Sequence, residues 1–364
     1  MEPDKIMVSY GDQPKKMVKE LLSKAKIEEE INKADLIALK PNLINASKSE
    51  EGATTDPELS RGVIEYLLSR GFENIIIMEG SWVGADTEEA FAKCGYKEIS
   101  EEYDIPLFNL QQTNYITKNV RGMEIEIAKK ALEVDYLINL PVLKGHCQTK
   151  ITCALKNLKG CLSDSEKRRF HQRGLHKPIA YLNEALTQDL IIVDGIYGDL
   201  DFEEGGNPVK MNRILLAKDP VLMDSYAANL LGYSPEDIEY IEIADQIGVG
   251  SKKLDQSKLV EINKDQAEQI DHSSRIIKKL AAKINERDAC SACYGSLVYA
   301  LKRIEERGKL SKIKDKISIG QGYKGESPAG PGIGVCCKNA EAAVLGCPPA
   351  AKDIIDFLEE EYDL

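Results

Sequence analysis

Cysteines near the end of the chain have a spacing that suits a metal centre. Cys290 and Cys293 form a Cys-x-x-Cys pair, whose short loop directs two sulfur atoms to one place. Cys336 or Cys337 follows more than forty residues later, and Cys347 stands directly before two prolines. Four thiolates on irregularly spaced loops are typical of a [4Fe–4S] cluster. The pattern therefore predicts such a cluster on Cys290, Cys293, Cys336 and Cys347.

Two other interpretations of these cysteines remain open. Four thiolates also satisfy a structural zinc ion, although zinc ribbons usually repeat a second Cys-x-x-Cys, which is absent here. The thiols can also be free of metal. Within the adjacent pair we favour Cys336, two residues after Gly334, and keep Cys337 as the alternative, because neighbouring thiolates rarely bind one cluster without strain.

A basic segment in the middle of the chain supplies a second group of reactive side chains. Between Lys144 and Lys177 nine Lys and Arg stand against Asp164 and Glu166, a net charge of +7 in a chain whose formal charge is −12. A small carboxylate or phosphate would match the cations, the titrating imidazole and the polar donors of this segment. These candidates are Lys144, His146, Thr152, Lys156 and Asn157.

A second loop has the features of an anion site. A strand is expected to end at Lys40 and Asn42, and Thr54 and Thr55 precede a predicted helix start, where free amides and hydroxyls bind anions readily. Asp194 closes the apolar run LIIVD and is a candidate for catalysis or for orienting a lysine. We therefore expect these residues to share one site with the basic segment.

Each of these patterns also has a purely structural interpretation. The basic segment is equally compatible with a solvated helix, and the loop before Thr54 with an ordinary capped connection. Cys147, Cys153 and Cys161 are a weaker candidate for a second metal site, because they contain no short pair. Cys94 is expected to be a buried filler.

Composition limits the class of protein. The chain has 364 residues, 43% hydrophobic and 30% charged, which is the mixture of a globular protein. No apolar run approaches the roughly 18 residues of a membrane helix, and the first residues resemble no signal peptide. Nine cysteines with these features suit a cytoplasmic protein. The net charge of −12 argues against nucleic acid or an anionic membrane as a partner.

The elements that must position these residues alternate between strands and helices. Asp56 and Pro57 start the clearest helix, which is expected over 57–70 and to end at Gly71. Apolar runs rich in Val, Ile and Leu predict strands at 5–9, 35–39, 74–78, 136–140, 190–193 and 213–217. The sequence thus predicts an α/β fold, a mostly parallel sheet with flanking helices, followed by a small C-terminal iron–sulfur module.

Three segments are expected along the chain. Residues 1–265 form the α/β ligand-binding domain, 266–287 a helical connector, and 288–364 the cysteine-rich iron–sulfur module. The connector is inferred from Ile276, Ile277, Leu280 and Ile284, which are spaced as one stripe of a helix.

Short sequences in a fixed order resemble one protein family. They are LKPNLI, GATTDPEL, INLPVLKGH, TCALKNLKGCL, IIVDGI, AKDPVLMD and the closing GCPP. Together they resemble the domain of unknown function 362 family of uncharacterised iron–sulfur proteins, from about Lys40 to the C-terminus. The resemblance implies an α/β domain and an iron–sulfur role without supplying a reaction. Many relatives carry a ferredoxin-like part with two cysteine-rich repeats, whereas this chain has a single-cluster tail.

The leading functional hypothesis is a redox protein with a single [4Fe–4S] centre. The cluster serves a small anionic substrate that is held by Lys40, Asn42, Lys144, His146 and Lys156. One cluster transfers one electron at a time, so a two-electron reaction needs a partner such as ferredoxin or a reductase.

Two further hypotheses come from other classes. A redox-neutral isomerase or lyase would use the cluster as a Lewis acid or as a structural element, while His146 and the lysines move protons. The lysine and histidine segment is more loosely similar to lactate-racemase-type enzymes, which use a covalently held nickel cofactor, but no motif carries that chemistry over. The third hypothesis is a non-enzymatic electron carrier or sensor.

Overall fold

The structure is a computed structural model that describes residues 1–205, 207–272 and 275–364. The chain forms two compact units. The large unit contains Met1–Arg168 and His176–Ser273, and the small unit contains Arg169–Leu175 and Ser274–Leu364.

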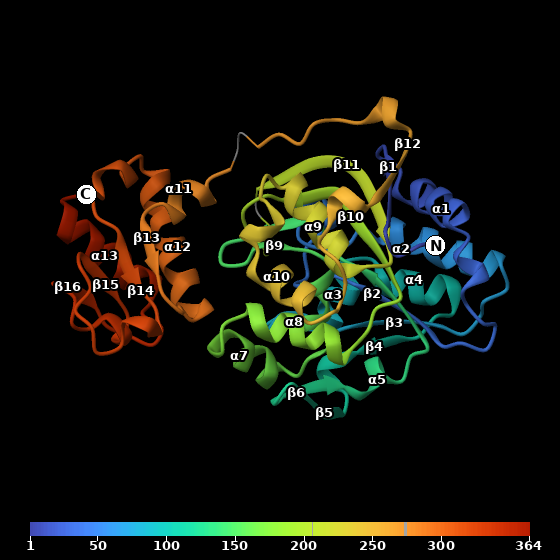
Figure 1. The fold of residues 1–364 in the computed structure, drawn as a ribbon, viewed down its shortest axis with the longest axis horizontal. Coiled ribbons are helices and arrows are strands. Elements are labelled where there is room, and N and C mark those ends of the chain that lie inside the picture. Colours follow the sequence, from blue (N-terminus) through green and yellow to red (C-terminus); the bar gives the residue numbers. More distant parts are fainter. Residues whose placement is uncertain (206, 273–274) are drawn as a thin grey trace. The chain divides into compact units, whose positions relative to one another are not determined.

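The large unit is built on an eight-stranded sheet with the order β12-β1-β11-β10-β7-β2-β3-β4 (Figure 1). Strand β11 runs antiparallel to both β1 and β10, and the other neighbours pair in parallel. The strands are β1 Lys5–Tyr10, β2 Ile37–Pro41, β3 Ile75–Glu79, β4 Leu107–Asn109, β7 Tyr136–Leu140, β10 Leu190–Asp199, β11 Pro208–Ala217 and β12 Lys258–Ile262. The predicted α/β fold with a mostly parallel sheet is confirmed.

Helices cover the sheet because its central strands are apolar on both faces. Every residue of β2, β3 and β7 is buried. Asp56 caps α2 as predicted, since its Oδ1 accepts a hydrogen bond of 2.8 Å from the backbone N of Glu58. The helices of this part of the chain are α1 Pro14–Ala25, α2 Pro57–Ser69, α3 Thr87–Lys93, α4 Tyr96–Tyr103, α5 Lys129–Leu132, α6 Ala154–Asn157, α7 Asp164–Gln172, α8 His176–Ala185, α9 Pro220–Leu230 and α10 Glu239–Gln246.

Parallel pairing brings the ends of distant segments to one edge of the sheet. Strands β3, β2, β7 and β10 are consecutive neighbours and run in the same direction. Their carboxyl ends therefore lie at the same edge, where open α/β sheets bind ligands. Two hairpins extend from the sheet: β5 Tyr115–Val120 pairs with β6 Met123–Ala128, and β8 Lys144–His146 pairs with β9 Lys150–Thr152.

The small unit has a sheet of its own, with the order β13-β14-β15-β16 and parallel pairing throughout. Helices α12 and α13 pack on each other through buried side chains that include Leu301 and Leu358. The elements are α11 Ile277–Ala281, β13 Ile284–Glu286, α12 Ser291–Glu306, β14 Ile317–Ile319, β15 Pro331–Ile333, β16 Ala342–Val344 and α13 Ala351–Tyr362.

The segment 266–287 differs from the continuous helical connector expected from the sequence. Its helix α11 covers only Ile277–Ala281, and Ile284 is the first residue of β13. Ile284 pairs with Ile317 in the small sheet, so strand pairing outweighs the helical spacing of the isoleucines. Residues 273 and 274 lie outside the described residues.

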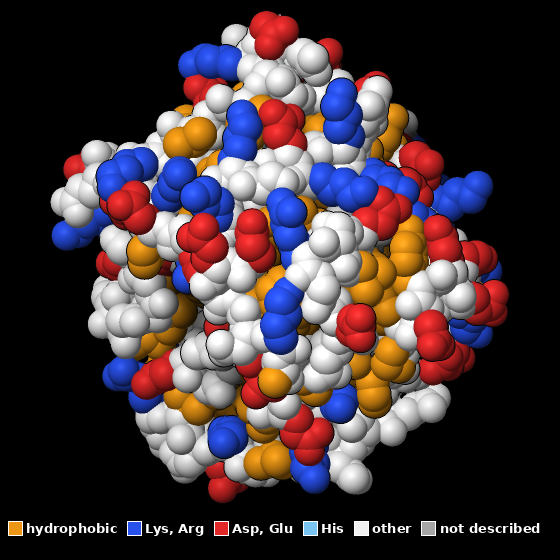
Figure 2. Space-filling view, turned by 90° about the vertical axis from the view of Figure 1, so that its right-hand side faces the viewer, with side chains coloured by type: hydrophobic (Ala, Val, Ile, Leu, Met, Phe, Trp, Pro, Cys, Tyr) orange, Lys and Arg blue, Asp and Glu red, His pale blue; other side chains and the backbone are white. Residues whose placement is uncertain are grey.

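Two observations describe the exterior. None of the helices in the described ranges combines the length and the hydropathy that a bilayer-spanning segment requires. Figure 2 shows a face on which Lys and Arg are interspersed with Asp and Glu, without a broad area of one sign.

Candidate functional site

The strand ends of the large unit carry a buried ion pair. Lys40, near the end of β2, places its Nζ 2.9 Å from Oε2 of Glu79, the last residue of β3. Both side chains are buried, and Glu79 Oε1 also accepts a hydrogen bond of 2.7 Å from the backbone N of Gly80. The pair is packed so closely that a Cβ at Gly160 would collide with the carboxylate. Lys40 is therefore fixed inside the protein.

The basic segment enters the same edge of the sheet from β7. Lys144, the first residue of β8, is fully buried, and its Nζ donates a hydrogen bond of 2.6 Å to the backbone carbonyl of Ala53. This contact joins the basic segment to the loop that precedes α2. The alternative of a solvated helix therefore does not hold for Lys144.

Lys156 and His146 meet at a single carboxylate oxygen. Lys156 Nζ lies 2.6 Å from Glu203 Oε2, and His146 Nε2 lies 3.1 Å from the same oxygen. Lys156 Nζ also donates to Oγ1 of Thr152, the last residue of β9, at 3.2 Å. Lys156 is only 2% exposed and His146 7%, so both donors act in a site with little water.

His146 is held as a neutral hydrogen-bond donor. The backbone N–H groups of Gln148 and Thr149 donate to its Nδ1 at 3.1 and 3.0 Å, so Nδ1 carries no proton and Nε2 does. Burial, followed by the positive charge of Lys156, lowers the pKa of His146 to about 4. Desolvation and the neighbouring lysine thus favour the neutral ring near pH 7, whereas the sequence predicted an imidazole that titrates there.

More lysines belong to this region. Burial lowers the pKa of Lys159 to about 7, with a further decrease from the charge of Lys156. Burial likewise lowers the pKa of Lys144 to about 8 and that of Lys167 below its usual range. Lys167 Nζ donates to the carbonyls of Gly80 and Ser81 at 3.2 and 2.8 Å, next to the ion pair of β2 and β3. We call the group Lys40, Lys144, Lys156, Lys159 and Lys167 the lysine cluster.

Glu203 reaches the lysine cluster from the loop after β10. Asp199, the last residue of β10, accepts backbone hydrogen bonds from Asp201, Phe202 and Asn207 at 2.8, 2.8 and 2.9 Å, which ties the loop at its base. The loop crosses β8 so closely that a Cβ at Gly145 would collide with the backbone of residue 200. These contacts fix the path of the loop, which places the carboxylate of Glu203 next to His146.

The other predicted residues of the second loop are used inside the protein. Thr55 Oγ1 donates to the carbonyl of Leu140 at 2.7 Å, and Thr54 Oγ1 donates to the carbonyl of Ser47 at 2.9 Å. Asp194 Oδ2 accepts from the backbone N of Asp56 at 2.7 Å. Burial and the charge of Asp56 raise the pKa of Asp194. The helix start of α2 is therefore occupied by the carboxylates of the protein itself.

Two asparagines present unsatisfied oxygens near Lys40. Asn157 Nδ2 donates to Asn139 Oδ1 at 2.7 Å, and the backbone N of Asn42 donates to Thr55 Oγ1 at 2.8 Å. Among the described residues, the buried Oδ1 atoms of Asn42 and Asn157 have no hydrogen-bond partner. Both oxygens are free to accept a hydrogen bond from a ligand or a water molecule.

The sequence analysis missed four residues of this region. Lys159 and Lys167 lie in the same basic segment, and the i, i+3 spacing of Lys156 and Lys159 on a helical turn is a signal that was present. Glu79 closes an apolar run of the sequence, as Asp194 does, and could have been found by the same argument. Glu203 has no such signal, because only the fold brings its loop to β8.

The small unit gathers the predicted thiols. Burial raises the pKa of Cys290, and the neighbouring thiols of Cys336 and Cys347 raise it further. Burial also raises the pKa of Cys293 to about 11, with added increases from Cys290, Cys347, Cys336 and Cys337. Each of these effects requires the sulfur atoms to lie near one another. In the described residues, however, no group of three or more His, Cys, Asp or Glu is arranged to hold a metal ion.

The two adjacent cysteines face different surroundings. Cys337 is fully buried, against the backbone of Gly332, where a Cβ would lie 2.8 Å from the Cβ of Cys337. Cys336 is partly exposed and lies close enough to Cys290 and Cys293 to affect both thiols. Cys290, Cys293, Cys336 and Cys347 remain the predicted ligands of a [4Fe–4S] cluster, with Cys337 as the alternative to Cys336.

The remaining cysteines lie in the large unit and are all free thiols. Cys94, Cys153 and Cys161 are buried, and burial raises the pKa of Cys94 to about 11 and those of Cys147 and Cys161 to about 12. Cys153 also has a pKa well above its usual value because of burial.

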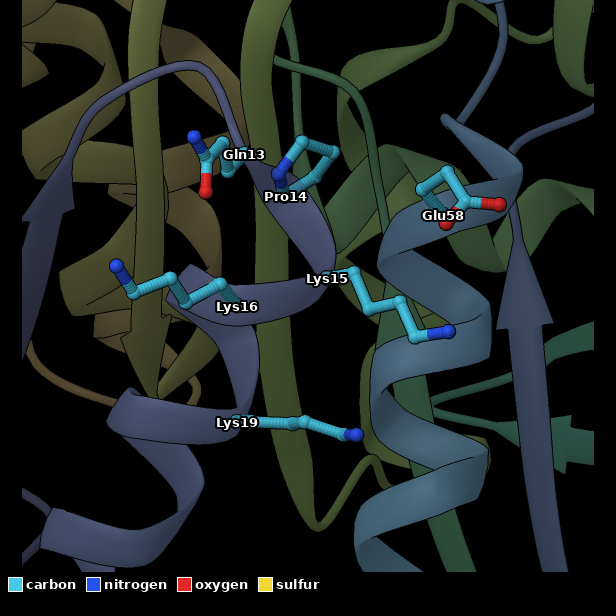
Figure 3. A pocket seen from close by; sticks show the side chains of 6 residues that line it. All are labelled: Gln13, Pro14, Lys15, Lys16, Lys19 and Glu58. Atoms are coloured by element: carbon cyan, nitrogen blue, oxygen red, sulfur yellow. The ribbon is translucent and has the colours of Figure 1, made fainter.

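A surface pocket of about 570 Å³ lies apart from these groups, beside helices α1 and α2 (Figure 3). Lys15 and Lys19 point from α1 toward α2, where both form ion pairs with Glu65, and Lys16 points away. The negative charge of Glu65 therefore offsets much of the positive charge of Lys15 and Lys19. Gln13, Pro14, Lys15, Lys16, Lys19 and Glu58 line it.

The lysine cluster has the components for stabilising negative charge on an oxygen atom. A charged Lys156 and a neutral His146 N–H aim at one position, in a region of low polarity where such interactions are strong. Lys159, with a pKa of about 7, can accept or donate a proton at neutral pH. The arrangement suits an anionic ligand whose charge changes during a reaction.

Three comparisons with known proteins found similar chains. The thylakoid-associated protein sll1697 of Synechocystis sp. is 24% identical over 230 residues, which cover 60% of this chain and 70% of that protein. The lactate racemase apoprotein of Thermoanaerobacterium thermosaccharolyticum is similar in structure with a TM-score of 0.39 and 15% identity, covering 57% of this chain and 54% of that chain. The chain therefore spans about half the length of that racemase. Residues 37–229, more than half of the chain, match the family described as domain of unknown function (DUF362). The resemblance seen in the sequence is confirmed, and the chain belongs to the DUF362 family.

Proposed function

We propose that the chain is an iron–sulfur enzyme that acts on a small anionic substrate bound at the lysine cluster of the large unit. The observation that carries this proposal is the convergence of Lys156 Nζ and His146 Nε2 on one oxygen, at 2.6 and 3.1 Å. Burial lowers the pKa values of Lys144 and Lys159, so negative charge brought next to them favours their charged forms. A bound anion would supply such charge.

The proposed cofactor is a [4Fe–4S] cluster held by Cys290, Cys293, Cys336 and Cys347. Gly334 supports this fit, because it has φ +83° and leaves an open approach to Cys293, whose Sγ would lie 3.9 Å from a Cβ at this position. Such a cluster transfers one electron at a time, so a redox reaction also requires an external partner, for which ferredoxin or a reductase is the proposed class. All nine cysteines are free, as expected in the reducing cytoplasm that we propose for the protein.

A specific observation favours a second candidate, a redox-neutral enzyme. His146 is fixed as a neutral donor, and Lys159 has a pKa of about 7. A neutral N–H donor and a lysine that shuttles a proton are suited to isomerisation next to a carboxylate. In this case the cluster would be structural or would act as a Lewis acid.

Two measurements test the proposal. Protein purified without oxygen should contain about four irons with acid-labile sulfide per chain and little zinc. Isothermal titration with small carboxylates and with inorganic phosphate should detect one anion site, and Lys156→Met should weaken it by about tenfold to a hundredfold, the value of a charge-assisted hydrogen bond.

Lys150 provides a matched control for the titration. It belongs to the same basic segment, but its Nζ donates to the carbonyl of Asp237 at 2.7 Å, outside the lysine cluster. Lys150→Met should leave the anion affinity unchanged. Equal losses in Lys150→Met and Lys156→Met would show only a general charge effect, and the anion site would be rejected. Stoichiometric zinc without iron would reject the cluster.

A further inference from the structure

Glu203 has an unusual place in the lysine cluster, because its side chain sits where an anionic ligand would bind. We propose that the carboxylate of Glu203 occupies the position of the substrate's carboxylate group, and that the natural ligand is a small carboxylic acid that displaces it. This inference rests on the proposed anion site and adds the chemical class of its ligand.

The first argument is the geometry of the two donors. Lys156 Nζ and His146 Nε2 donate to the same atom, Glu203 Oε2, and both are fixed by other contacts. The hydrogen bonds to Nδ1 hold the His146 ring, and Lys156 is held by Thr152. Neither donor depends on Glu203 for its direction, so another carboxylate oxygen at the same place would be bound equally well.

The second argument is the exposure of Glu203. Its side chain is 19% exposed, against 1% for Lys156 and 8% for His146. Glu203 is thus the outermost of the three groups, and a rotation of its long side chain toward water opens the donors. The loop backbone can stay in place during this rotation, since Asp199 anchors it.

The number and charge of the donors favour a carboxylate over a phosphate as the ligand. The position receives one ammonium group and one neutral N–H, which together match a single negative charge. A phosphate dianion usually binds more donors, often the free amides of a helix N-terminus. At α2 those amides are already occupied, because Asp56 accepts from the N of Glu58 and Asp194 accepts from the N of Asp56.

The experiment compares Glu203→Gln with the wild-type protein. Isothermal titration with acetate, glycolate and inorganic phosphate measures the affinities of both proteins. The neutral amide that this substitution introduces is a weaker competitor for Lys156 than a carboxylate, so the affinity for acetate and glycolate should rise by about tenfold or more. Phosphate should gain less. Lys156→Met in the Glu203→Gln background should remove the gain.

Glu204 is the matched control. It is the next residue, carries the same charge and is felt by Lys144 and Lys156 at longer range, but its side chain is exposed and, among the described contacts, makes no ion pair with His146 or Lys156. Glu204→Gln should change the carboxylate affinity by less than about twofold. If both variants gain equally, the effect is a general change of charge and the inference is overturned. A larger gain for phosphate than for carboxylates would overturn the ligand class.

The outcomes also separate this inference from the proposed function. If wild-type protein binds acetate through Lys156 while Glu203→Gln binds it no better, the anion site stands and the displacement of Glu203 is wrong. If neither protein binds any of the three anions, both fail. If Glu203→Gln does not fold, Glu203→Asp replaces it in the experiment, because the aspartate side chain is one methylene shorter and withdraws the carboxylate. Glu203→Asp should give a smaller gain in affinity for acetate and glycolate. No gain would overturn the inference.

Discussion

Lys40 Nζ and Glu79 Oε2 lie 2.9 Å apart at the ends of two neighbouring parallel strands, with both side chains excluded from water. Charges buried in this way lose their hydration, and only mutual attraction and additional hydrogen bonds offset that loss. Glu79 receives such bonds from the backbone N atoms of Gly80 and Leu43 at 2.7 and 3.4 Å. Through this ion pair, strands β2 and β3 hold Lys40 in its place in the lysine cluster.

The first prediction is that Glu79→Gln lowers the free energy of unfolding by about 3–5 kcal/mol, because Lys40 is left as an uncompensated buried charge. Lys40→Met in the Glu79→Gln background should recover part of the loss. Urea unfolding can be followed by the fluorescence of Trp82, the only tryptophan of the chain. Glu133→Gln, which removes the exposed pair with Lys129, should cost less than about 0.5 kcal/mol. Equal effects of the two substitutions would contradict the prediction.

The second prediction concerns the pH dependence of anion binding. The charged forms of Lys144 and Lys159 attract an anion, and their pKa values are lowered to about 8 and 7. Affinity should therefore be highest below pH 7 and fall as the pH rises through 7 and 8. If the bound anion raises one of these pKa values by about one unit, the loss is about tenfold.

Isothermal titration at several pH values between about 5.5 and 9.5 measures this dependence. In Lys159→Met the step near pH 7 should disappear while the step near pH 8 remains. His146 should give no step between pH 5 and 7, because its pKa is about 4. A fall in affinity near pH 6.5 that vanishes in His146→Asn would show that the imidazole does titrate.

The third prediction identifies the ligands of the proposed cluster. Serine at any one of the four grouped positions should reduce the iron content well below about four per chain, since each removes one thiolate. These variants are Cys290→Ser, Cys293→Ser, Cys336→Ser and Cys347→Ser. Cys337→Ser should retain the iron, because the side chain of Cys337 is fully buried against Gly332, whereas that of Cys336 is partly exposed.

Cys94→Ser, in the large unit, is the control for the third prediction. Iron and acid-labile sulfide are measured on protein that is purified without oxygen. Loss of the cluster in Cys337→Ser but not in Cys336→Ser would reverse the assignment within the adjacent pair. Loss in Cys94→Ser would mean that the small unit does not carry the cluster.

The sequence predicted those parts of the molecule that depend on local pattern. Buried parallel strands are continuous apolar runs, so β7 is found at the predicted residues, and β1, β2 and β3 lie within two residues of the predicted bounds. The antiparallel pair β10 and β11 is longer than predicted, because it continues beyond the apolar runs at 190–193 and 213–217. The edge of a parallel sheet follows from the strand directions, which is why Lys40 and Lys144 could be expected near one another. Glu203 could not be expected there, because its contacts depend on the path of a loop 47 residues after Lys156.

Burial is the physical quantity that the sequence analysis judged least well. His146 was expected to titrate near neutral pH, but its pKa depends on desolvation and on Lys156, and both depend on tertiary packing. Thr54 and Thr55 were expected to offer hydroxyl groups to a ligand, whereas the folded chain uses them for the carbonyls of Ser47 and Leu140. A motif predicts which groups are present, and packing decides which of them remain available.

The last prediction concerns Asp224 in α9, whose carboxylate supports the helix that carries Lys156. Its Oδ1 and Oδ2 accept from the backbone N atoms of Ala154 and Leu155 at 2.7 and 3.3 Å. Burial raises the pKa of Asp224 to about 7. The folded state therefore binds a proton that the unfolded chain releases near pH 4, and this contribution to stability is lost as the pH rises from about 4 through 7. Urea unfolding at several pH values should show a flatter profile for Asp224→Asn than for wild type, and an unchanged slope would contradict the prediction.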